Sequence, residues 1–211
     1  MIETLEEYWK SFHTSQNTAL LTDSNPSAVI KNLGIHNIFS ILNKEDAHIL
    51  TIGVGMGKLE RDIHSWKIKV SSLDITPEAF KCIEGILHNQ YLSADVDKLP
   101  TDTFDLAISY MVACHQSDQV LQIQIQEILR ALKPTGIFAL LVAGPGDNPH
   151  VYTGDEMDHC RRGSKMRTPQ EITELVKVSG GDVKWVGEPL GGCTSFIMSY
   201  PVHIIKHTSE K

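Results

Sequence analysis

The sequence lacks the features that mark secreted, membrane-spanning and disulfide-stabilised proteins. Its four cysteines, Cys82, Cys114, Cys160 and Cys193, include no CxxC pair, which favours reduced thiols over a disulfide framework or a zinc site. The longest apolar runs, such as residues 136–144, are far shorter than the roughly 20 residues of a membrane-spanning helix. The first ten residues carry three glutamates and no apolar stretch of a secretory signal. We therefore expect a cytoplasmic protein without a membrane segment and without a structural metal.

Basic residues are also few. The chain has 19 Lys and Arg against 26 Asp and Glu, a formal net charge of -7. Proteins that bind nucleic acid through its phosphates carry basic surfaces, so nucleic acid is not the expected partner. A local cluster, Arg161, Arg162, Lys165 and Arg167, is expected to lie in a solvated loop, where it would also suit an anionic small substrate. The length of 211 residues predicts one structural unit. A monomer or homodimer is expected.

Short apolar runs alternate with amphipathic stretches along most of the chain. Runs typical of buried strands lie at residues 47–54, 67–73, 89–94, 104–111 and 136–142. Helical spacing of apolar residues predicts helices at residues 58–65, 77–87, 120–132 and 169–179. Alternation of strand and helix favours a doubly wound α/β fold, in which helices cover both faces of a mostly parallel sheet.

The two ends of the chain depart from this alternation. Residues 1–43 are expected to form a helical cap or lid, with helices at 5–12 and 27–42, over the carboxyl edge of a sheet built by residues 44–211. At the other end, β-rich runs flank Gly191-Gly192, which predicts an antiparallel hairpin that completes the sheet.

A glycine-rich turn follows the first expected strand. Gly53, Gly55 and Gly57 permit a tight turn and let the backbone approach a ligand, which then faces the amino terminus of the next helix. The second strand ends at Asp74, and an acid there can accept hydrogen bonds from both hydroxyls of a ribose. These features fit a nicotinamide dinucleotide or S-adenosylmethionine, and the spacing GxGxG in place of GxGxxG favours the latter.

With these motifs in order, residues 47–205 resemble the class I S-adenosylmethionine-dependent methyltransferases of small molecules. HILTIGVGMG is similar to the glycine loop of that family, VSSLDIT to its ribose-binding strand end, and SADVDKLP to its adenine-side acid. FDLAISYMVACHQSD resembles the fourth strand, and EILRALKPTGIFALLV the helix and fifth strand. The resemblance implies a Rossmann-like sheet of seven strands with an antiparallel carboxyl-terminal hairpin strand.

The resemblance also implies roles for individual residues. Gly53, Val54, Gly55 and Gly57 would line the methionine and ribose of the cofactor. The remaining cofactor contacts would come from the ends of three further strands, with Asp74 on the ribose hydroxyls, Asp95 on the adenine amino group, Ile75 and Val96 on the ring, and Ser109 and Met111 beside the sulfonium. The family usually has an acid where Thr51 stands, and that acid helps to organise the amino group of the cofactor.

Groups for the chemical step are candidates only. His115 follows the fourth strand, where a neutral imidazole can remove a proton from an acceptor, although a loop histidine without function fits equally well. His150 and Tyr152 lie in the long loop after the fifth strand, over the expected substrate position.

The acceptor is predicted by exclusion. Residues 109–112 read Ser-Tyr-Met-Val, which lacks the Asn- or Asp-Pro-Pro-aromatic tetrad of enzymes that methylate nucleic acid bases. A metabolite, sugar or natural-product intermediate, methylated on oxygen or nitrogen, is therefore expected. Two alternatives stay open: a nicotinamide-dependent oxidoreductase, and a member of the fold that binds ligands or partners without catalysis.

Overall fold

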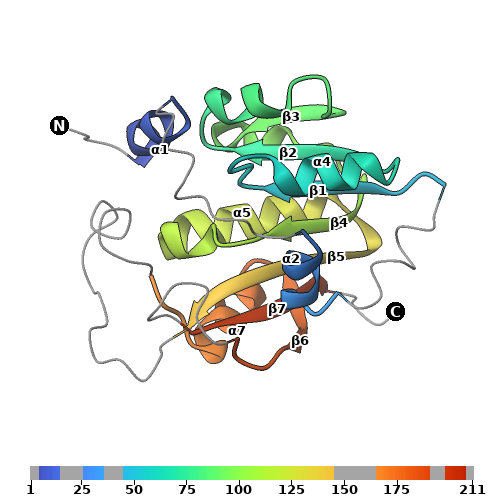
Figure 1. The fold of residues 1–211 in the computed structure, drawn as a ribbon. Helices are drawn as coiled ribbons and strands as arrows, with labels where there is room; N and C mark the ends of the chain where they lie inside the picture. The colour runs from blue at the N-terminus through green and yellow to red at the C-terminus, as the bar shows by residue number, and fades with distance from the viewer. Residues whose placement is uncertain (1–4, 15–25, 36–44, 145–164, 191–197, 208–211) are drawn as a thin grey trace.

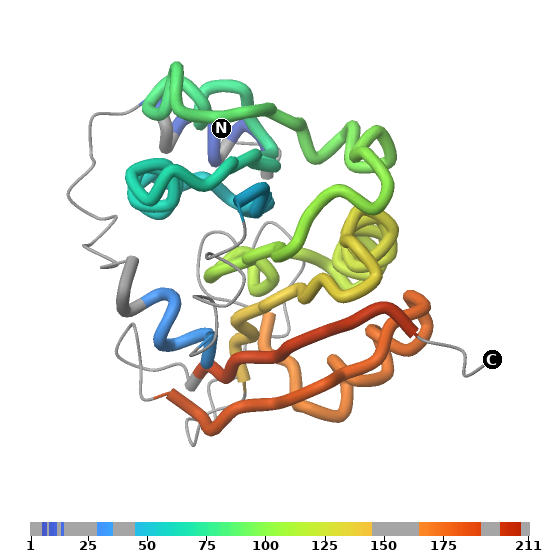
Figure 2. The backbone as a smooth tube through the Cα atoms, turned by 90° about the vertical axis from the view of Figure 1, so that its right-hand side faces the viewer, coloured from blue at the N-terminus to red at the C-terminus, as the bar shows by residue number. Residues whose placement is uncertain are grey.

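The chain folds around one seven-stranded sheet in the computed structural model (Figure 1). The structure describes residues 5–14, 26–35, 45–144, 165–190 and 198–207. The strands, in order along the chain, are β1 (His48–Ile52), β2 (Lys69–Asp74), β3 (Asn89–Leu92), β4 (Phe104–Ser109), β5 (Leu132–Gly144), β6 (Gly181–Val186) and β7 (Met198–Lys206). Their order across the sheet is β3-β2-β1-β4-β5-β7-β6, which Figure 2 shows from top to bottom.

All neighbouring pairs from β3 to β5 are parallel, whereas β7 runs antiparallel to both β5 and β6. The last strand of the chain is therefore inserted between β5 and β6. This arrangement confirms the predicted fold class, a doubly wound sheet that is mostly parallel and has an antiparallel carboxyl-terminal strand. Parallel neighbours direct the carboxyl ends of β1, β2, β3 and β4 to one edge, where ligands bind in open α/β sheets.

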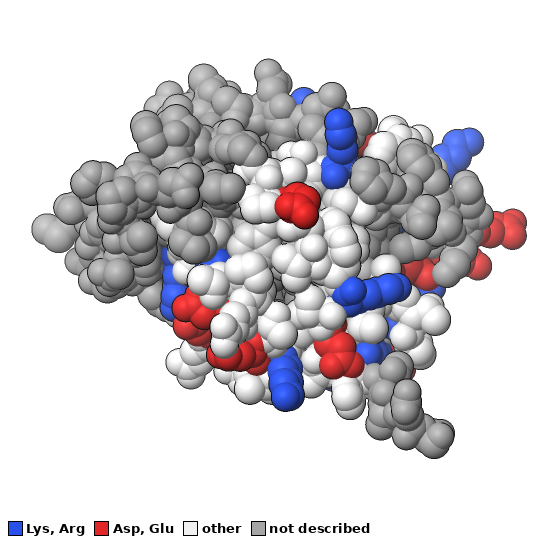
Figure 3. All heavy atoms as spheres, turned by 90° about the horizontal axis from the view of Figure 1, so that it is seen from below, with Lys and Arg blue, Asp and Glu red and all other residues white. Residues whose placement is uncertain are grey.

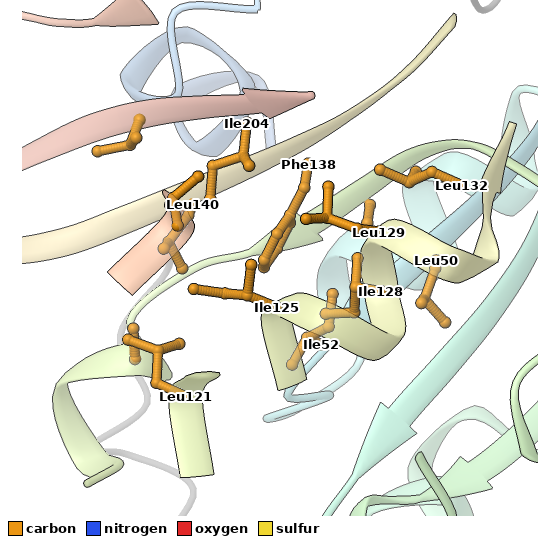
Figure 4. Close-up of a cluster of buried hydrophobic side chains, with 14 of the residues drawn as sticks. Leu50, Ile52, Leu121, Ile125, Ile128, Leu129, Leu132, Phe138, Leu140 and Ile204 are labelled. Atoms are coloured by element: carbon orange, nitrogen blue, oxygen red, sulfur yellow. The ribbon is translucent and has the colours of Figure 1, made fainter. Parts of the chain in front are cut away.

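One face of the sheet packs against α5 (Asp118–Ala131) and α7 (Pro169–Val178). Leu50 and Ile52 of β1 point to this face and belong to the same buried cluster as Ile125 and Ile128 of α5 and Phe138 of β5 (Figure 4). Both helices begin at a side-chain cap, Ser117 for α5 and a capping box of Thr168 and Glu171 for α7. Such caps satisfy amide groups that the first helical turn leaves unpaired.

The other face is covered by α2 (Pro26–Asn32) and α4 (Lys58–Ser65). Ile49 of β1 points there, because successive strand residues alternate between faces, and it packs in one cluster with Leu33 and Ile63. The Leu33 carbonyl oxygen and Nε2 of His203 on β7 are 2.6 Å apart, which joins the segment after α2 to the last strand. Thus α2 lies on a sheet face and not at the carboxyl edge.

The first helix, α1 (Leu5–Thr14), does lie at the carboxyl edge (Figure 1). Lys10 forms an ion pair of 3.6 Å with Glu78, which follows β2, and the Trp9 ring meets the His115 ring edge-on at 5.2 Å. The amino-terminal region predicted as one cap is therefore divided between two places in the described residues. Of the two described helices before β1, α1 is the one at the edge where the cofactor is expected.

Three elements differ from the pattern-based prediction. A helix was expected at residues 27–42, but α2 ends at Asn32 and a turn follows it. Residues 77–87 were expected to be a helix of full length, but the structure has a 3-10 helix, η2 (Pro77–Ile83), followed by a turn with Gly85 at φ 78°. A left-handed glycine ends a helix, which explains the early stop. Strand β5 is longer than the apolar run at residues 136–142 that predicted it. Leu132 pairs with Phe104 and Gly144 with Met198, so backbone pairing extends the strand at both ends.

Arg167 corrects the prediction that the basic cluster lies in a solvated loop. Its side chain is only 2% exposed and donates to Asp118 Oδ1 and to the carbonyl oxygens of Ala113 and Gln116. Tyr200 of β7 donates in turn to the Arg167 carbonyl oxygen. A guanidinium is tolerated in the interior when an anion and several acceptors surround it, so Arg167 connects β7, α7 and the start of α5. Arg161 and Arg162 lie outside the described residues.

The surface agrees with the modest charge of the sequence. On the face that Figure 3 shows, Lys and Arg side chains alternate with Asp and Glu side chains across uncharged surface, in the part of it that the structure describes. None of the described helices is both long and apolar enough to span a bilayer.

We predict that the packing of α5 carries much of the stability. Ile128 is fully buried under the sheet, whereas Ile123 on the same helix is 48% exposed. Ile128→Ala should lower the free energy of unfolding by about 2–5 kcal/mol through lost burial and the cavity left behind. Ile123→Ala, the matched control, should change it by about 0.5 kcal/mol or less. Urea unfolding of both variants checks this, and equal losses would contradict the described packing.

Candidate functional site

The glycine turn connects β1 to α4 at the carboxyl edge of the sheet. Gly53, Gly55 and Gly57 all have left-handed backbone angles, with φ of 78°, 54° and 68°. The Gly53 amide donates to the Leu73 carbonyl oxygen at 2.8 Å, which holds the start of the turn against the end of β2. Since side chains other than glycine are strained in this region, the backbone conformation explains all three residues.

The space around the three glycines separates their roles. A Cβ atom on Gly53 would lie 2.3 Å from the Val112 side chain, and one on Gly57 would lie 2.0 Å from Ile83. Those two glycines are therefore needed for packing. A Cβ on Gly55 meets no atom within 4 Å, so Gly55 faces open space. The middle of the turn is the part whose backbone a ligand can approach.

Asp74 holds the turn from the end of β2. Its Oδ2 accepts the Val54 amide at 2.8 Å and its Oδ1 accepts the Thr76 amide at 3.1 Å. The residue is only 6% exposed. The structure thus brings the predicted ribose-binding acid against the glycine turn and also uses it to organise the segment that leads into η2. Val54 itself is buried against Phe80 and Ile83.

The end of β4 supplies two more predicted residues. Ser109, the last residue of β4, is fully buried, and its hydroxyl has no hydrogen-bond partner among the described residues. Met111 has a φ of 60°, a left-handed conformation that is uncommon for a side chain of this size. Strained residues concentrate at binding sites, where the surrounding structure enforces them. This bend sends Val112 back over Gly53.

The adenine-side residues lie after β3. Asp95 is in the 3-10 helix η3 (Ser93–Lys98) and pairs with Lys98 Nζ at 2.6 Å. Val96 packs partly buried against the main core cluster, and Ile75 after β2 is half-buried. All three therefore lie beyond the carboxyl ends of neighbouring strands, although Asp95 already has a cationic partner.

Of the catalytic candidates, only His115 can be placed. It ends the short helix η4 (Ala113–His115) after β4 and lies under Trp9 of α1. His150 and Tyr152 lie outside the described residues. His115, the glycine turn and α1 therefore share the carboxyl edge, which is the arrangement that a general base near a bound cofactor requires.

Two buried polar groups at this edge escaped the sequence-based prediction. Glu60 lies in the first turn of α4 and is 1% exposed, and Thr76 follows β2 and is fully buried. Neither Glu60 carboxyl oxygen nor the Thr76 hydroxyl has a hydrogen-bond partner among the described residues. The residue pattern of α4 did not mark Glu60 as a buried residue. Its place, three residues after the last glycine of the turn, is the signal that could have identified it.

A hollow of about 260 Å³ lies elsewhere, at the junction of α5 and α7. Its lining includes Asp118, Lys165, Glu171 and Leu175, and none of the predicted site residues. Among the described residues, no three His, Cys, Asp or Glu side chains gather as metal ligands would. The site at the glycine turn is thus defined by backbone geometry and unpaired polar atoms.

Comparison with known families supports this assignment. A family model described as "Methyltransferase domain" matches residues 50–140, which include the glycine turn, Asp74, Asp95 and the end of β4. Residues 50–140 of this chain therefore match a methyltransferase domain. The recognition from sequence is thereby confirmed, together with the enzyme class and the choice of S-adenosylmethionine over a nicotinamide dinucleotide. A comparison with curated proteins found no match.

Solved structures share the fold of the methyltransferase domain. The 1,6-didemethyltoxoflavin-N1-methyltransferase of Burkholderia thailandensis, solved with S-adenosylhomocysteine, is 17% identical with a TM-score of 0.69, over 99% of this chain and 92% of that one. The magnesium protoporphyrin IX methyltransferase of Synechocystis, also solved with S-adenosylhomocysteine, is 13% identical with a TM-score of 0.67. The match covers 96% of this chain and 98% of that one. A mitomycin 7-O-methyltransferase is 17% identical with a TM-score of 0.66. The match covers 95% of this chain and 60% of that one.

At this edge of the sheet, Glu60 is an acid with a strongly perturbed pKa. Burial raises its pKa from 4.5 to about 7, and the nearby Asp74 carboxylate adds to the rise. The Thr51 hydroxyl and Arg61 lie close enough to offset part of it. Arg61 directs its N–H groups to the carbonyl oxygens of Met56 and Cys82, so no salt bridge neutralises Glu60 among the described residues.

We predict that Glu60 makes stability fall as pH rises. The folded protein keeps the Glu60 proton up to about pH 7, whereas the unfolded chain releases it near 4.5, so unfolding becomes easier across this window and levels off above it. The loss should reach about 3 kcal/mol. Glu60→Gln, which stays neutral, should match wild type near pH 4 and exceed it near pH 8, by up to that amount.

Chemical denaturation across this pH range measures the difference between the two proteins. Glu84→Gln is the matched control, because Glu84 is exposed after η2. A constant difference between wild type and Glu60→Gln at every pH would show that Glu60 ionises normally in the folded state.

Proposed function

We propose that this chain binds S-adenosylmethionine at the carboxyl edge of β1, β2 and β4 and transfers its methyl group to an oxygen or nitrogen of a small molecule. The observation that carries the proposal is the open space at Gly55, in a left-handed glycine turn that Asp74 holds against the end of β2. The buried hydroxyl groups of Ser109 and Thr76, which have no partner among the described residues, also fit a polar ligand at this edge.

The bound cofactor supplies an electrophilic methyl group on a positively charged sulfur. The residues of this chain have three tasks. Gly55 leaves room for the methionine part against its backbone, and Asp74, held at the end of β2 by the Val54 and Thr76 amides, accepts from the ribose hydroxyls. His115 takes the proton from the acceptor, while α1 excludes water through the Trp9 contact.

A small acceptor is supported by the acidic balance of the chain and by the strand-four sequence Ser109–Val112, which lacks the tetrad for base methylation. Three structural neighbours are named as methyltransferases of 1,6-didemethyltoxoflavin, magnesium protoporphyrin IX and mitomycin. His150 and Tyr152 are proposed to contact the acceptor from the loop after β5. A location in the cytoplasm and a monomeric or homodimeric state complete the proposal.

We predict that S-adenosylhomocysteine binds at Gly55. Gly55→Ala should abolish the ligand-induced rise in melting temperature, because the new methyl group occupies the space for the ligand. Gly180→Ala is a matched control, since Gly180 also has a positive φ, with nothing within 4 Å, at the far end of α7. Both variants should lose about 1 kcal/mol of stability through backbone strain.

Differential scanning fluorimetry with S-adenosylhomocysteine and with NAD provides the measurement, because a ligand raises the melting temperature by mass action. A rise with NAD alone in the wild type would refute the proposed function. A normal rise in Gly55→Ala would show that the ligand lies elsewhere.

We also predict that Asp74 contributes directly to affinity. Asp74→Asn keeps one oxygen as an acceptor but loses the charge, and it should weaken S-adenosylhomocysteine binding by about 1–3 kcal/mol. Asp46→Asn is the matched control, because Asp46 is exposed just before β1, at the opposite edge of the sheet. Isothermal titration calorimetry checks both. Equal affinities in the two variants would place the ribose away from Asp74.

A further inference from the structure

Glu60 presents an unusual combination of burial and missing partners. The side chain is 1% exposed, and neither carboxyl oxygen makes a hydrogen bond of good geometry among the described residues, although the Thr51 hydroxyl and the Glu60 amide lie near enough to moderate the rise of its pKa. Buried carboxyl groups are normally paired or hydrogen-bonded, because burial without a partner costs several kcal/mol. An acid kept in such a place is typical of a site that is completed by a ligand.

The surroundings of Glu60 show which kind of ligand is missing. It lies beside the Thr51 hydroxyl of β1 and near the Asp74 carboxylate of β2, and the charged or titratable groups around it are Asp74, Arg61 and Cys82. Arg61, the one cation in this set, donates to two carbonyl oxygens. Glu60 and Asp74 therefore are two buried acids close to each other, and no described side chain brings a hydrogen-bonded cation to Glu60.

Geometry connects this pair to the glycine turn. Glu60 is the third residue after Gly57, in the first turn of α4, and Asp74 binds the Val54 amide in the middle of the turn. A cation that entered beside Gly55 would thus approach the two acids. The cofactor carries two positive groups, an ammonium and a sulfonium. Only the ammonium has N–H donors that can satisfy carboxyl oxygens, so the unpaired oxygens favour the ammonium.

We propose that Glu60 is a cofactor-binding residue whose carboxylate accepts hydrogen bonds from the α-ammonium of S-adenosylmethionine. This inference rests on the proposed function and goes beyond it by assigning the ammonium subsite to a side chain of α4. The raised pKa of Glu60, about 7, supports it, because an acid that is protonated without ligand must ionise when a cation binds. Binding then releases a proton below neutral pH.

The first test compares wild type with Glu60→Gln by calorimetry with S-adenosylhomocysteine, which keeps the ammonium and lacks the sulfonium charge. The wild-type affinity should rise roughly tenfold between about pH 6 and pH 8, as Glu60 ionises. Proton release, measured in two buffers of different ionisation enthalpy, should accompany binding near pH 6. Glu60→Gln should bind at least about tenfold more weakly at pH 8, with no pH dependence in this range and no proton release.

A second ligand isolates the ammonium. Methylthioadenosine has the adenosine and the sulfur but no amino acid part, so Glu60→Gln should bind it as wild type does. An equal loss for both ligands would mean that the variant disturbs the whole site, which would overturn the assignment. Glu84→Gln, with its exposed side chain, should bind both ligands as wild type does.

A rescue variant uses the contact with Thr51. Glu60→Thr alone should lose affinity for S-adenosylhomocysteine, and Thr51→Asp with Glu60→Thr should recover most of it, because the carboxyl group moves across the contact from helix to strand. Wild-type binding with unchanged affinity and pH profile in Glu60→Gln would overturn the inference alone. Absence of binding in the wild type would overturn the proposed function and the inference with it.

Discussion

The carboxylate of Asp74 is the constraint on which the site depends. It joins two chain segments that parallel pairing places at the same edge, by accepting the Val54 amide of the glycine turn and the Thr76 amide that follows β2. Hydrogen bonds from backbone amides to a buried carboxylate are stronger than those between neutral groups. They hold the turn in its left-handed conformation, and Gly55 consequently faces open space.

Packing around this constraint separates structural from ligand-facing positions. Gly53 and Gly57 press against Val112 and Ile83, so the outer glycines let neighbouring elements approach the turn closely. The bend at Met111, with its positive φ, is what brings Val112 there. On the other side of the edge, Arg167 connects η4, α5 and β7 through buried hydrogen bonds. The scaffold near the site is therefore closely packed at its sides and open at its centre.

Acidic side chains are concentrated at this edge. Asp74 accepts from backbone amides, whereas the buried Glu60 oxygens have no hydrogen bond of good geometry within the part of the chain that the structure describes. Such an arrangement lowers the stability of the ligand-free protein near neutral pH and favours a cationic ligand, since the same charge that burial penalises is neutralised on binding. Loss of stability in exchange for binding is a common property of functional sites.

Much of the fold could be predicted because local patterns and pairing rules agree. Alternating apolar runs and amphipathic helices indicated parallel strands, and α4 has the predicted bounds of Lys58–Ser65. The glycine spacing indicated the turn because left-handed backbone angles favour glycine whatever the tertiary context. Residues 77–87 were harder, since the helical pattern there competes with Gly85, which shortens the helix to a 3-10 turn.

The sequence by itself determined the fold class, the glycine turn and the position of Asp74 at a strand end, because these follow from periodicity and backbone chemistry within short segments. Only the tertiary structure decided which charged side chains are buried. Arg167 was expected in a solvated loop and Glu60 drew no attention, yet both are almost fully enclosed. Burial of a charge depends on contacts between segments far apart in the chain, such as α4 with the ends of β1 and β2, and residue type alone carries no record of them.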